Sequence, residues 1–187
     1  MEFPVPVFKA AHKVESKRIY EGDIVNFRVD KVRLEDGQET IRELVEHNGG
    51  VVIACQPAED KVVLISQYRY SVDEDLLELP AGRIEIGEDP LHAATRELTE
   101  ETGYRAKIWR ELVRMYSAPG FCNEMLYMFH ASEVELVSKN LDYDEETEVI
   151  VLDTEDAWQL VLDGKIRDAK TVSGIGMLLA EKYKRIF

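Results

Sequence analysis

The chain is poor in cysteine and has no long apolar run. Among its 187 residues only Cys55 and Cys122 are cysteines, too few for a disulfide framework, and neither has a second cysteine at metal-site spacing. We expect both to be small buried hydrophobic residues. No stretch approaches the roughly twenty apolar residues of a membrane-spanning helix. The segment from Met1 to Pro4 lacks the basic and apolar regions of a signal peptide, so a cytoplasmic location without a membrane partner is predicted.

Positively charged residues are also scarce. Lysine and arginine together number 23 against 37 aspartates and glutamates, which gives a formal net charge of −14. A protein that holds nucleic acid through its phosphate backbone needs a basic face, so no nucleic-acid partner is expected. An acidic enzyme that acts on a phosphate substrate needs a divalent cation between its own carboxylates and the phosphates. Charge alone does not establish such an enzyme, because many proteins are acidic for solubility.

The N-terminal part of the chain has the pattern of a small antiparallel sheet. Strand-like segments occur at Lys17–Tyr20, Ile24–Leu34 and Glu39–Glu46, and Asp36-Gly37 is a favourable hairpin turn between the last two. The length of the chain fits one domain with such an appendage. We therefore expect an N-terminal β-sheet region over residues 1–45 and a main domain over residues 46–187.

The remainder alternates between strand and helix patterns, which indicates an α/β fold. Two apolar, β-branched runs, Val51–Cys55 and Val62–Gln67, are typical of central strands. A helix is expected over Pro90–Thr102, with proline in its first turn and Gly103 at its end. Further strands are expected at Trp109–Tyr116, Met125–His130 and Val149–Leu152. Two helices are expected after them, at Glu155–Leu162 and Thr171–Tyr183.

Three carboxylates share one edge of the helix at Pro90–Thr102. Glu100 and Glu101 follow Glu97 by three and four residues, so all three fall within an arc of about 100°. Stacked like charges destabilise a helix, and Arg96 offsets only part of the repulsion. A hard divalent cation, magnesium or manganese, would offset the rest. The adjoining arc carries apolar residues expected to anchor the helix to the sheet: Leu91, Ala94 and Leu98.

A wider pattern surrounds these carboxylates. By itself the helix could be a solvated acidic face. However, the spacing of the specified residues matches the complete Nudix signature: Gly82, Glu88, Arg96, Glu97, Leu98, Glu100, Glu101 and Gly103. At roughly 6% per specified residue, the pattern should recur by chance less often than about once in 10⁸ positions. The chain thus resembles the Nudix hydrolases, and the one departure, Tyr104 in place of an aliphatic residue, lies at a packing position.

The resemblance implies both a fold and a metal site. Nudix hydrolases have an α/β/α sandwich with a mixed sheet, and here a small N-terminal antiparallel sheet would be added. Glu88 and Arg96 would form a salt bridge that fixes the loop against the helix, with a catalytic role as the alternative. Magnesium is the implied cofactor, with manganese as a possible substitute. The implied metal ligands are the carbonyl of Ala81 and the carboxylates of Glu97, Glu100 and Glu101.

Within that family the chain resembles the ADP-ribose pyrophosphatases. Glu78 leads the Leu-Pro-Ala-Gly entry to the signature, and Pro119 lies about fifteen residues after the signature. An acidic segment from Asp144 to Val149 resembles their C-terminal acidic loop. These enzymes exchange an N-terminal sheet across a homodimer, so a homodimer is implied. Ala118 and Thr147 depart from the usual residues and indicate a possible shift in substrate preference.

The resemblance also implies catalytic and substrate-binding residues. Glu145 is the first choice for the general base and Glu148 the second, with metal binding as an alternative for Glu148. A solvated charge run is the alternative for each residue of this loop, and Glu100 completes the predicted catalytic set. The implied contacts to the substrate are Arg42, Arg69, Gly82, Pro119, Gly120 and Glu124. Arg42 would act in the partner subunit's site, and ordinary surface salt bridges are the alternative for both arginines.

The predicted reaction is the metal-dependent hydrolysis of the diphosphate bond of ADP-ribose to AMP and ribose 5-phosphate. One alternative is a pyrophosphatase for nucleotide sugars of the GDP-mannose type. Another is a non-catalytic Nudix module that senses ADP-ribose. A module of that kind would be expected to lose one or more glutamates of the signature, whereas this chain has all of them.

Overall fold

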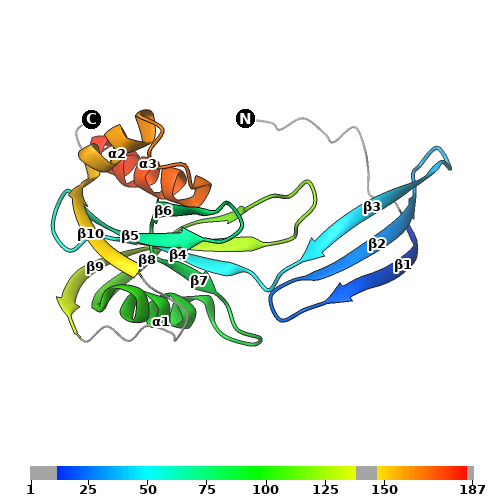
Figure 1. Cartoon of the computed structure of the whole chain (residues 1–187), viewed down its shortest axis with the longest axis horizontal. Coiled ribbons are helices and arrows are strands. Elements are labelled where there is room, and N and C mark those ends of the chain that lie inside the picture. Colours follow the sequence, from blue (N-terminus) through cyan, green and yellow to red (C-terminus); the bar gives the residue numbers. More distant parts are fainter. Residues whose placement is uncertain (1–11, 138–146, 185–187) are drawn as a thin grey trace. The chain divides into compact units, whose positions relative to one another are not determined.

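The computed structural model describes residues 12–137 and 147–184 (Figure 1). The chain divides into two compact units, which are described separately. The first comprises the residues up to His47 together with Ala118–Glu124, and the second comprises Asn48–Ser117 and the residues from Met125 onward.

The first unit is a three-stranded antiparallel sheet in the order β1-β2-β3. Its strands are β1 (His12–Glu21), β2 (Asn26–Arg33) and β3 (Glu39–Glu46). The expected hairpin turn joins β2 to β3. Gly37 has a φ of 85°, and the Asp36 carboxylate accepts a hydrogen bond from the Gln38 amide at 3.0 Å. A left-handed backbone explains why glycine stands there.

The sheet of the first unit leaves one whole strand and several apolar side chains exposed to solvent. β1 is exposed along its whole length, and none of the described helices belongs to this unit. Large apolar side chains therefore remain exposed at Val14, Ile19, Tyr20, Ile24 and Ile41. Large apolar side chains are usually removed from water by packing, so this exposure suits a surface that another chain can cover.

The second unit contains two sheets (Figure 1). The first has the order β7-β4-β9-β8, in which β4 and β9 run parallel and the other neighbours antiparallel. The second has the order β10-β5-β6 and is antiparallel. The strands are β4 (Gly50–Cys55), β5 (Lys61–Arg69), β6 (Glu74–Glu78), β7 (Ala81–Arg83), β8 (Tyr104–Tyr116), β9 (Met125–Leu136) and β10 (Thr147–Asp153).

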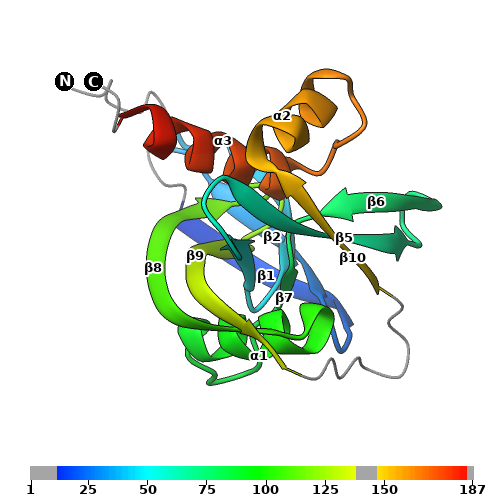
Figure 2. The same cartoon turned by 90° about the vertical axis from the view of Figure 1, so that its left-hand side faces the viewer.

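Helices cover this unit on both sides (Figure 2). Helix α1 (Pro90–Thr102) lies on one side, and α2 (Thr154–Leu162) and α3 (Ala169–Lys184) lie on the other. Alternate residues of β4 supply the two cores, because side chains along a strand point to opposite faces. Val52 packs with Ile175 of α3, whereas Val51 packs with Leu98 of α1, and all four are fully buried. The expected α/β/α arrangement is confirmed.

Helix α1 has the bounds that the sequence predicts. The Asp89 side chain caps it by accepting hydrogen bonds from the amides of Leu91 at 2.9 Å and His92 at 3.2 Å. Gly103 ends it in a left-handed conformation, with a φ of 73°. One detail of the expected apolar face was wrong: Leu91 is 40% exposed, whereas Ala93 is fully buried together with the expected Ala94 and Leu98. Leu91 lies in the first turn of α1, ahead of the part that packs on the sheet.

Several strands differ from the prediction. β8 and β9 are longer than expected, and β6 and β7 were not predicted at all. Each of these two strands is short and carries charged residues, so neither has a pronounced apolar pattern. Cys55 is fully buried, as expected, and burial raises the pKa of its thiol to about 12; Cys122 is only partly buried. In the described parts of the chain, no helix is long and apolar enough to cross a membrane.

Candidate active site

The signature loop meets helix α1 at Ala81 and Gly82. The amide of Ala81 donates a hydrogen bond of 2.9 Å to the carboxylate of Glu101, which is 1% exposed. The preceding carbonyl, that of Pro80, accepts a hydrogen bond of 2.8 Å from the amide of Ile53 on β4. The loop is therefore held between the central strand and the last turn of the helix.

Gly82 is required at its position by close approach. A methyl group placed on Gly82 would overlap the carboxylate of Glu97. The backbone of the loop and this carboxylate consequently lie closer together than any residue other than glycine allows. The glycine of the signature thus brings a carboxylate against the backbone next to Ala81.

Arg96 ties the acidic groups of the signature together. Its guanidinium donates to both carboxylate oxygens of Glu88, at 3.2 and 3.1 Å, to Glu97 at 2.7 Å and to Glu100 at 3.1 Å. A fifth hydrogen bond, of 3.1 Å, reaches the carbonyl of Arg83 in the loop. The salt bridge expected between Glu88 and Arg96 is therefore present, and Arg96 also offsets the repulsion among the helix carboxylates.

These contacts shift two pKa values. The hydrogen bonds from Arg96, aided by the Glu85 amide, lower the pKa of Glu88 to about 2. Burial alone lowers the pKa of Arg96, but the facing carboxylates of Glu88, Glu97 and Glu100 more than offset burial and raise it. Both groups are therefore fully charged at neutral pH.

The donor set fits a hard cation. Oxygen is the only ligand type offered by the carboxylates of Glu97, Glu100 and Glu101 and the carbonyl of Ala81, and magnesium and manganese prefer oxygen. Among the residues that the structure describes, no three acidic, histidine or cysteine side chains converge on one point as a closed metal site. Magnesium usually keeps several waters and binds through one or two carboxylates, so a closed site is not required.

A second charged cluster lies on β5 and β6. The sequence analysis named Arg69 and Glu78 separately but predicted no contact between them. Arg69 donates two hydrogen bonds, through Nε and Nη2 and both of 2.8 Å, to the carboxylate of Glu78. Lys170, which lies in the first turn of α3, contacts the same carboxylate. The Glu78 carboxylate raises the pKa of Arg69, and the charge of Glu101 adds to the rise, so Arg69 lies within electrostatic reach of the signature helix. The available sequence signal was an acidic residue directly before the buried Leu79.

A neighbouring residue of β5 was also missed. Gln67 is 8% exposed, and within the described residues its Oε1 atom has no hydrogen-bond partner. It pairs with Thr147 across the ladder, and the Thr147 hydroxyl donates a 3.1 Å hydrogen bond to the carbonyl of Glu101. β10 therefore begins beside the end of helix α1.

The two predicted bases fall on or before β10. Glu145 lies outside the described residues. Glu148 is exposed and pairs with Ser66, so its side chain is on the opposite face of the sheet from Thr147.

The other predicted substrate contacts belong to the first unit. Arg42 is exposed on β3 and donates a 3.0 Å hydrogen bond to the carbonyl of Ile41. Pro119 and Gly120 are exposed in a turn. The carboxylate of Glu124 lies 3.4 Å from Nδ1 of His47.

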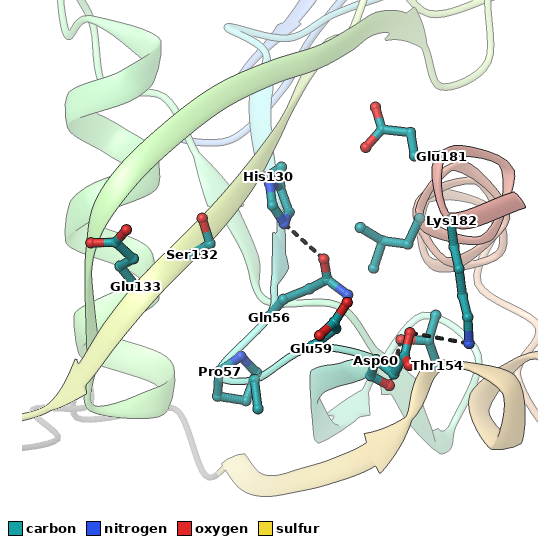
Figure 3. Close-up of a pocket in the computed structure, with 12 residues that line it drawn as sticks. Gln56, Pro57, Glu59, Asp60, His130, Ser132, Glu133, Thr154, Glu181 and Lys182 are labelled. Carbon is teal, nitrogen blue, oxygen red and sulfur yellow. Dashed lines mark hydrogen bonds and ion pairs between the residues drawn. The ribbon is translucent and has the colours of Figure 1, made fainter. Parts of the chain in front are cut away.

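A cavity of about 620 Å³ lies elsewhere in the second unit (Figure 3). Gln56, just after β4, lines it, whereas β7 pairs with the opposite end of β4. Its polar groups pair with one another: Nε2 of His130 lies 2.9 Å from Oε1 of Gln56, and Lys182 lies 3.1 Å from Asp60. None of the site residues predicted from the sequence lines the cavity. It is therefore separate from the signature cluster.

Comparison with known proteins identifies the family. The NUDIX domain model matches residues 46–173, and the chain belongs to the Nudix family. Together with the intact signature, this match makes the chain a Nudix hydrolase.

Two individual relatives and one solved structure are similar to the chain over most of its length. The chain is 36% identical to "ADP-ribose pyrophosphatase" of Bacillus subtilis, over 88% of this chain and 90% of that protein. It is 34% identical to "GDP-mannose pyrophosphatase" of Yersinia pestis, over 72% of each chain. A solved structure described as an ADP compounds hydrolase has the same fold, with a TM-score of 0.83 at 20% identity, over 97% of this chain and 98% of that one.

Proposed function

We propose that this Nudix hydrolase cleaves the diphosphate bond of ADP-ribose to give AMP and ribose 5-phosphate in a metal-dependent reaction. The observation that carries the proposal is the arrangement of Glu97 and Glu101 against the Ala81–Gly82 turn. Similarity to an ADP-ribose pyrophosphatase over most of both chains supports this choice of substrate.

The residues at the turn have distinct tasks in this proposal. Glu97, Glu100 and Glu101, with the carbonyl of Ala81, would hold magnesium, for which manganese could substitute. The metal would supply charge to neutralise the diphosphate and to lower the pKa of the attacking water. Arg96 holds Glu97 and Glu100 on the signature side of the helix. Positioning and electrostatics supply most of the acceleration in phosphoryl transfer, so these residues matter more than any single base.

The base and the substrate contacts complete the proposal. Glu145 remains the first choice for the base and Glu148 the second; Thr147, between them, is hydrogen-bonded to the backbone of Glu101. Donors on Arg69 and the close backbone at Gly82 bind the phosphates. From the first unit, the proposed contacts are Arg42, Pro119, Gly120 and Glu124.

A homodimer is part of the same proposal. The sheet of residues 1–45 would be exchanged between two subunits, while residues 46–187 form the hydrolase domain. The exposed apolar residues of this sheet support it, because a second copy would remove them from water. Arg42 would then act in the partner subunit's site. We also expect the enzyme to work in the cytoplasm without a nucleic-acid or membrane partner.

A second substrate class has a specific observation in its favour. The GDP-mannose pyrophosphatase of Yersinia pestis is nearly as similar to the chain, at 34% identity, as the ADP-ribose relative, although over less of its length. A substrate panel therefore decides between a nucleotide linked to ribose and a nucleotide linked to a hexose.

The test measures product release with magnesium across ADP-ribose, GDP-mannose, NADH, diadenosine polyphosphates and nucleoside triphosphates. We expect the highest kcat/KM for ADP-ribose and a loss of about 10³-fold in Glu101→Gln. A preference for GDP-mannose would replace the proposed substrate but keep the reaction type. Binding of ADP-ribose without any cleavage would instead show a sensing module.

A further inference from the structure

Glu78 is a buried acid outside the signature. It is the last residue of β6 and 1% exposed, and it lies three residues before Ala81. Burying a carboxylate is costly unless charged hydrogen-bond donors surround it. Burial alone raises the pKa of Glu78, but the hydrogen bonds and charges of Arg69 and Lys170 more than offset this and hold it below its ordinary value.

The strand register explains why Glu78 can reach Arg69. Glu78 pairs with Ile65 on β5, and directly paired residues share one face of the sheet. Arg69 is four residues further along β5 on that same face, about 13 Å away at the usual rise of a strand. The two long side chains must therefore lie along the sheet surface toward each other, which fixes the direction of the guanidinium.

Only one edge of the guanidinium is used. Nε and Nη2 of Arg69 donate to Glu78, each at 2.8 Å, in the two-pronged geometry that fixes a guanidinium plane. Within the described residues, Nη1 makes no hydrogen bond, and the side chain of Arg69 is 36% exposed. The remaining edge therefore presents donors toward solvent.

The other side of Glu78 is tied to helix α3. Lys170 contacts Glu78 and lies 3.0 Å from Asp168. The Asp168 carboxylate accepts hydrogen bonds from the amide of Thr171 at 2.9 Å and from its hydroxyl at 2.6 Å. That hydroxyl in turn accepts a 2.8 Å hydrogen bond from the amide of Leu79. Glu78 and the residue after it are thus both held to the start of α3.

We infer that Glu78 is a positioning residue for the substrate: it fixes Arg69 so that the Nη1 edge faces the diphosphate. The inference rests on the proposed function, in which Arg69 binds a phosphate. An arginine held in advance loses less side-chain freedom on binding than a free one does. Glu78 therefore acts on substrate affinity through Arg69 and makes no contact with the reacting atoms.

The test compares Glu78→Gln with the matched control Glu74→Gln. Glu74 lies on the same strand, directly opposite Arg69, and its exposed side chain pairs with Arg167. The side chain of Arg69 bonds to Glu78 and not to Glu74, so this control separates a charge beside Arg69 from the carboxylate that holds it. We expect Glu78→Gln to raise KM about tenfold while kcat changes less than about threefold, and Glu74→Gln to leave both unchanged.

Two further variants separate positioning from a merely structural role. In an Arg69→Met background, Glu78→Gln should raise KM no further, because the group through which it acts is gone. Glu78→Asp keeps the charge but withdraws the carboxylate, so it should also raise KM, and it serves where Glu78→Gln fails to fold. Additive effects on KM, or an unchanged KM with only a lower unfolding temperature, would overturn the inference.

The activity of the wild type shows whether a negative result counts against this inference or against the proposed function. If the wild type cleaves ADP-ribose, the KM comparison applies directly. If it does not, the proposed function fails, and the Kd of ADP, measured by calorimetry for the same variants, tests Glu78 independently. An equal Kd for wild type, Glu78→Gln and Arg69→Met would then refute the role of Glu78.

Discussion

Two charged clusters in the second unit have opposite compositions. In the signature cluster, one guanidinium, Arg96, faces the carboxylates of Glu88, Glu97 and Glu100. In the cluster on β5 and β6, one carboxylate, Glu78, faces two cations. The first has an excess of negative charge, which suits a metal cation. In the second, Asp168 also contacts Lys170, so the charges balance, and it is the unused donors of Arg69 that suit a phosphate. A diphosphate enzyme needs both, and here each rests on a single central residue.

The largest expected effect comes from filling the space against the signature cluster. Gly82→Ala should lower kcat/KM by at least about 10²-fold, because the added methyl overlaps the Glu97 carboxylate and displaces it. The matched control is Gly176→Ala in α3, where a methyl would meet only Trp158 at an ordinary 3.6 Å. That change should keep activity and add roughly 0.5–1 kcal/mol of stability. Equal activity of the two variants would contradict the close approach at Gly82.

Removing the central cation of the signature cluster should come next. Arg96→Met leaves three carboxylates without their shared partner, so we expect about 2 kcal/mol of destabilisation without metal, or roughly 4–8 °C in Tm. Magnesium should raise the Tm of this variant more than that of the wild type, since a divalent cation relieves the same repulsion. Thermal unfolding with and without magnesium measures both effects. Equal magnesium shifts would show that the metal does not bind at these carboxylates.

The acid side of the signature cluster should show a pH dependence. The folded-state pKa of Glu88 is lowered from 4.5 to about 2, so its ion pair stabilises the fold above about pH 4.5 and is lost as the pH falls toward 2. Glu88→Gln should therefore lower the free energy of unfolding by about 1–2 kcal/mol at pH 7, with the difference shrinking below pH 4.5. Urea unfolding across this range measures the difference. Glu85→Gln, exposed in the same loop, is the control and should show no such trend.

The smallest effect is expected in the cluster on β5 and β6. Lys170→Met leaves the two hydrogen bonds between Arg69 and Glu78 in place, so the buried carboxylate keeps a cation. We expect less than about 1 kcal/mol of destabilisation and a change in KM of less than about threefold, measured by thermal unfolding and steady-state kinetics. A loss as large as that of Arg96→Met would show that the two clusters do not differ in the way described.

Sequence reasoning succeeded where the determinants are local. The bounds of α1 follow from Pro90 and Gly103, which lie at its two ends, and the structure adds Asp89 as its cap. The contact between Arg96 and Glu100 follows from their spacing of four residues along the helix. Such features need no knowledge of distant segments.

Sequence reasoning failed where interacting residues are far apart in the chain. Glu78 and Lys170 are separated by 92 residues, and their contact depends on how β6 and α3 pack. β6 itself was not predicted, because its pairing with β5 gives a short charged segment an order that its own residues do not show. The residues that support a site are therefore harder to predict than the residues within a motif.

The hydrogen bond between Leu79 and Thr171 has a consequence for the order of folding. It joins the entry of the signature loop to α3, 92 residues later in the chain. A contact between segments so far apart requires the closure of a long loop, whereas helix α1 needs only neighbouring residues. The signature helix should therefore form before the segment ahead of Ala81 gains its anchor, and the metal site should be completed late in folding.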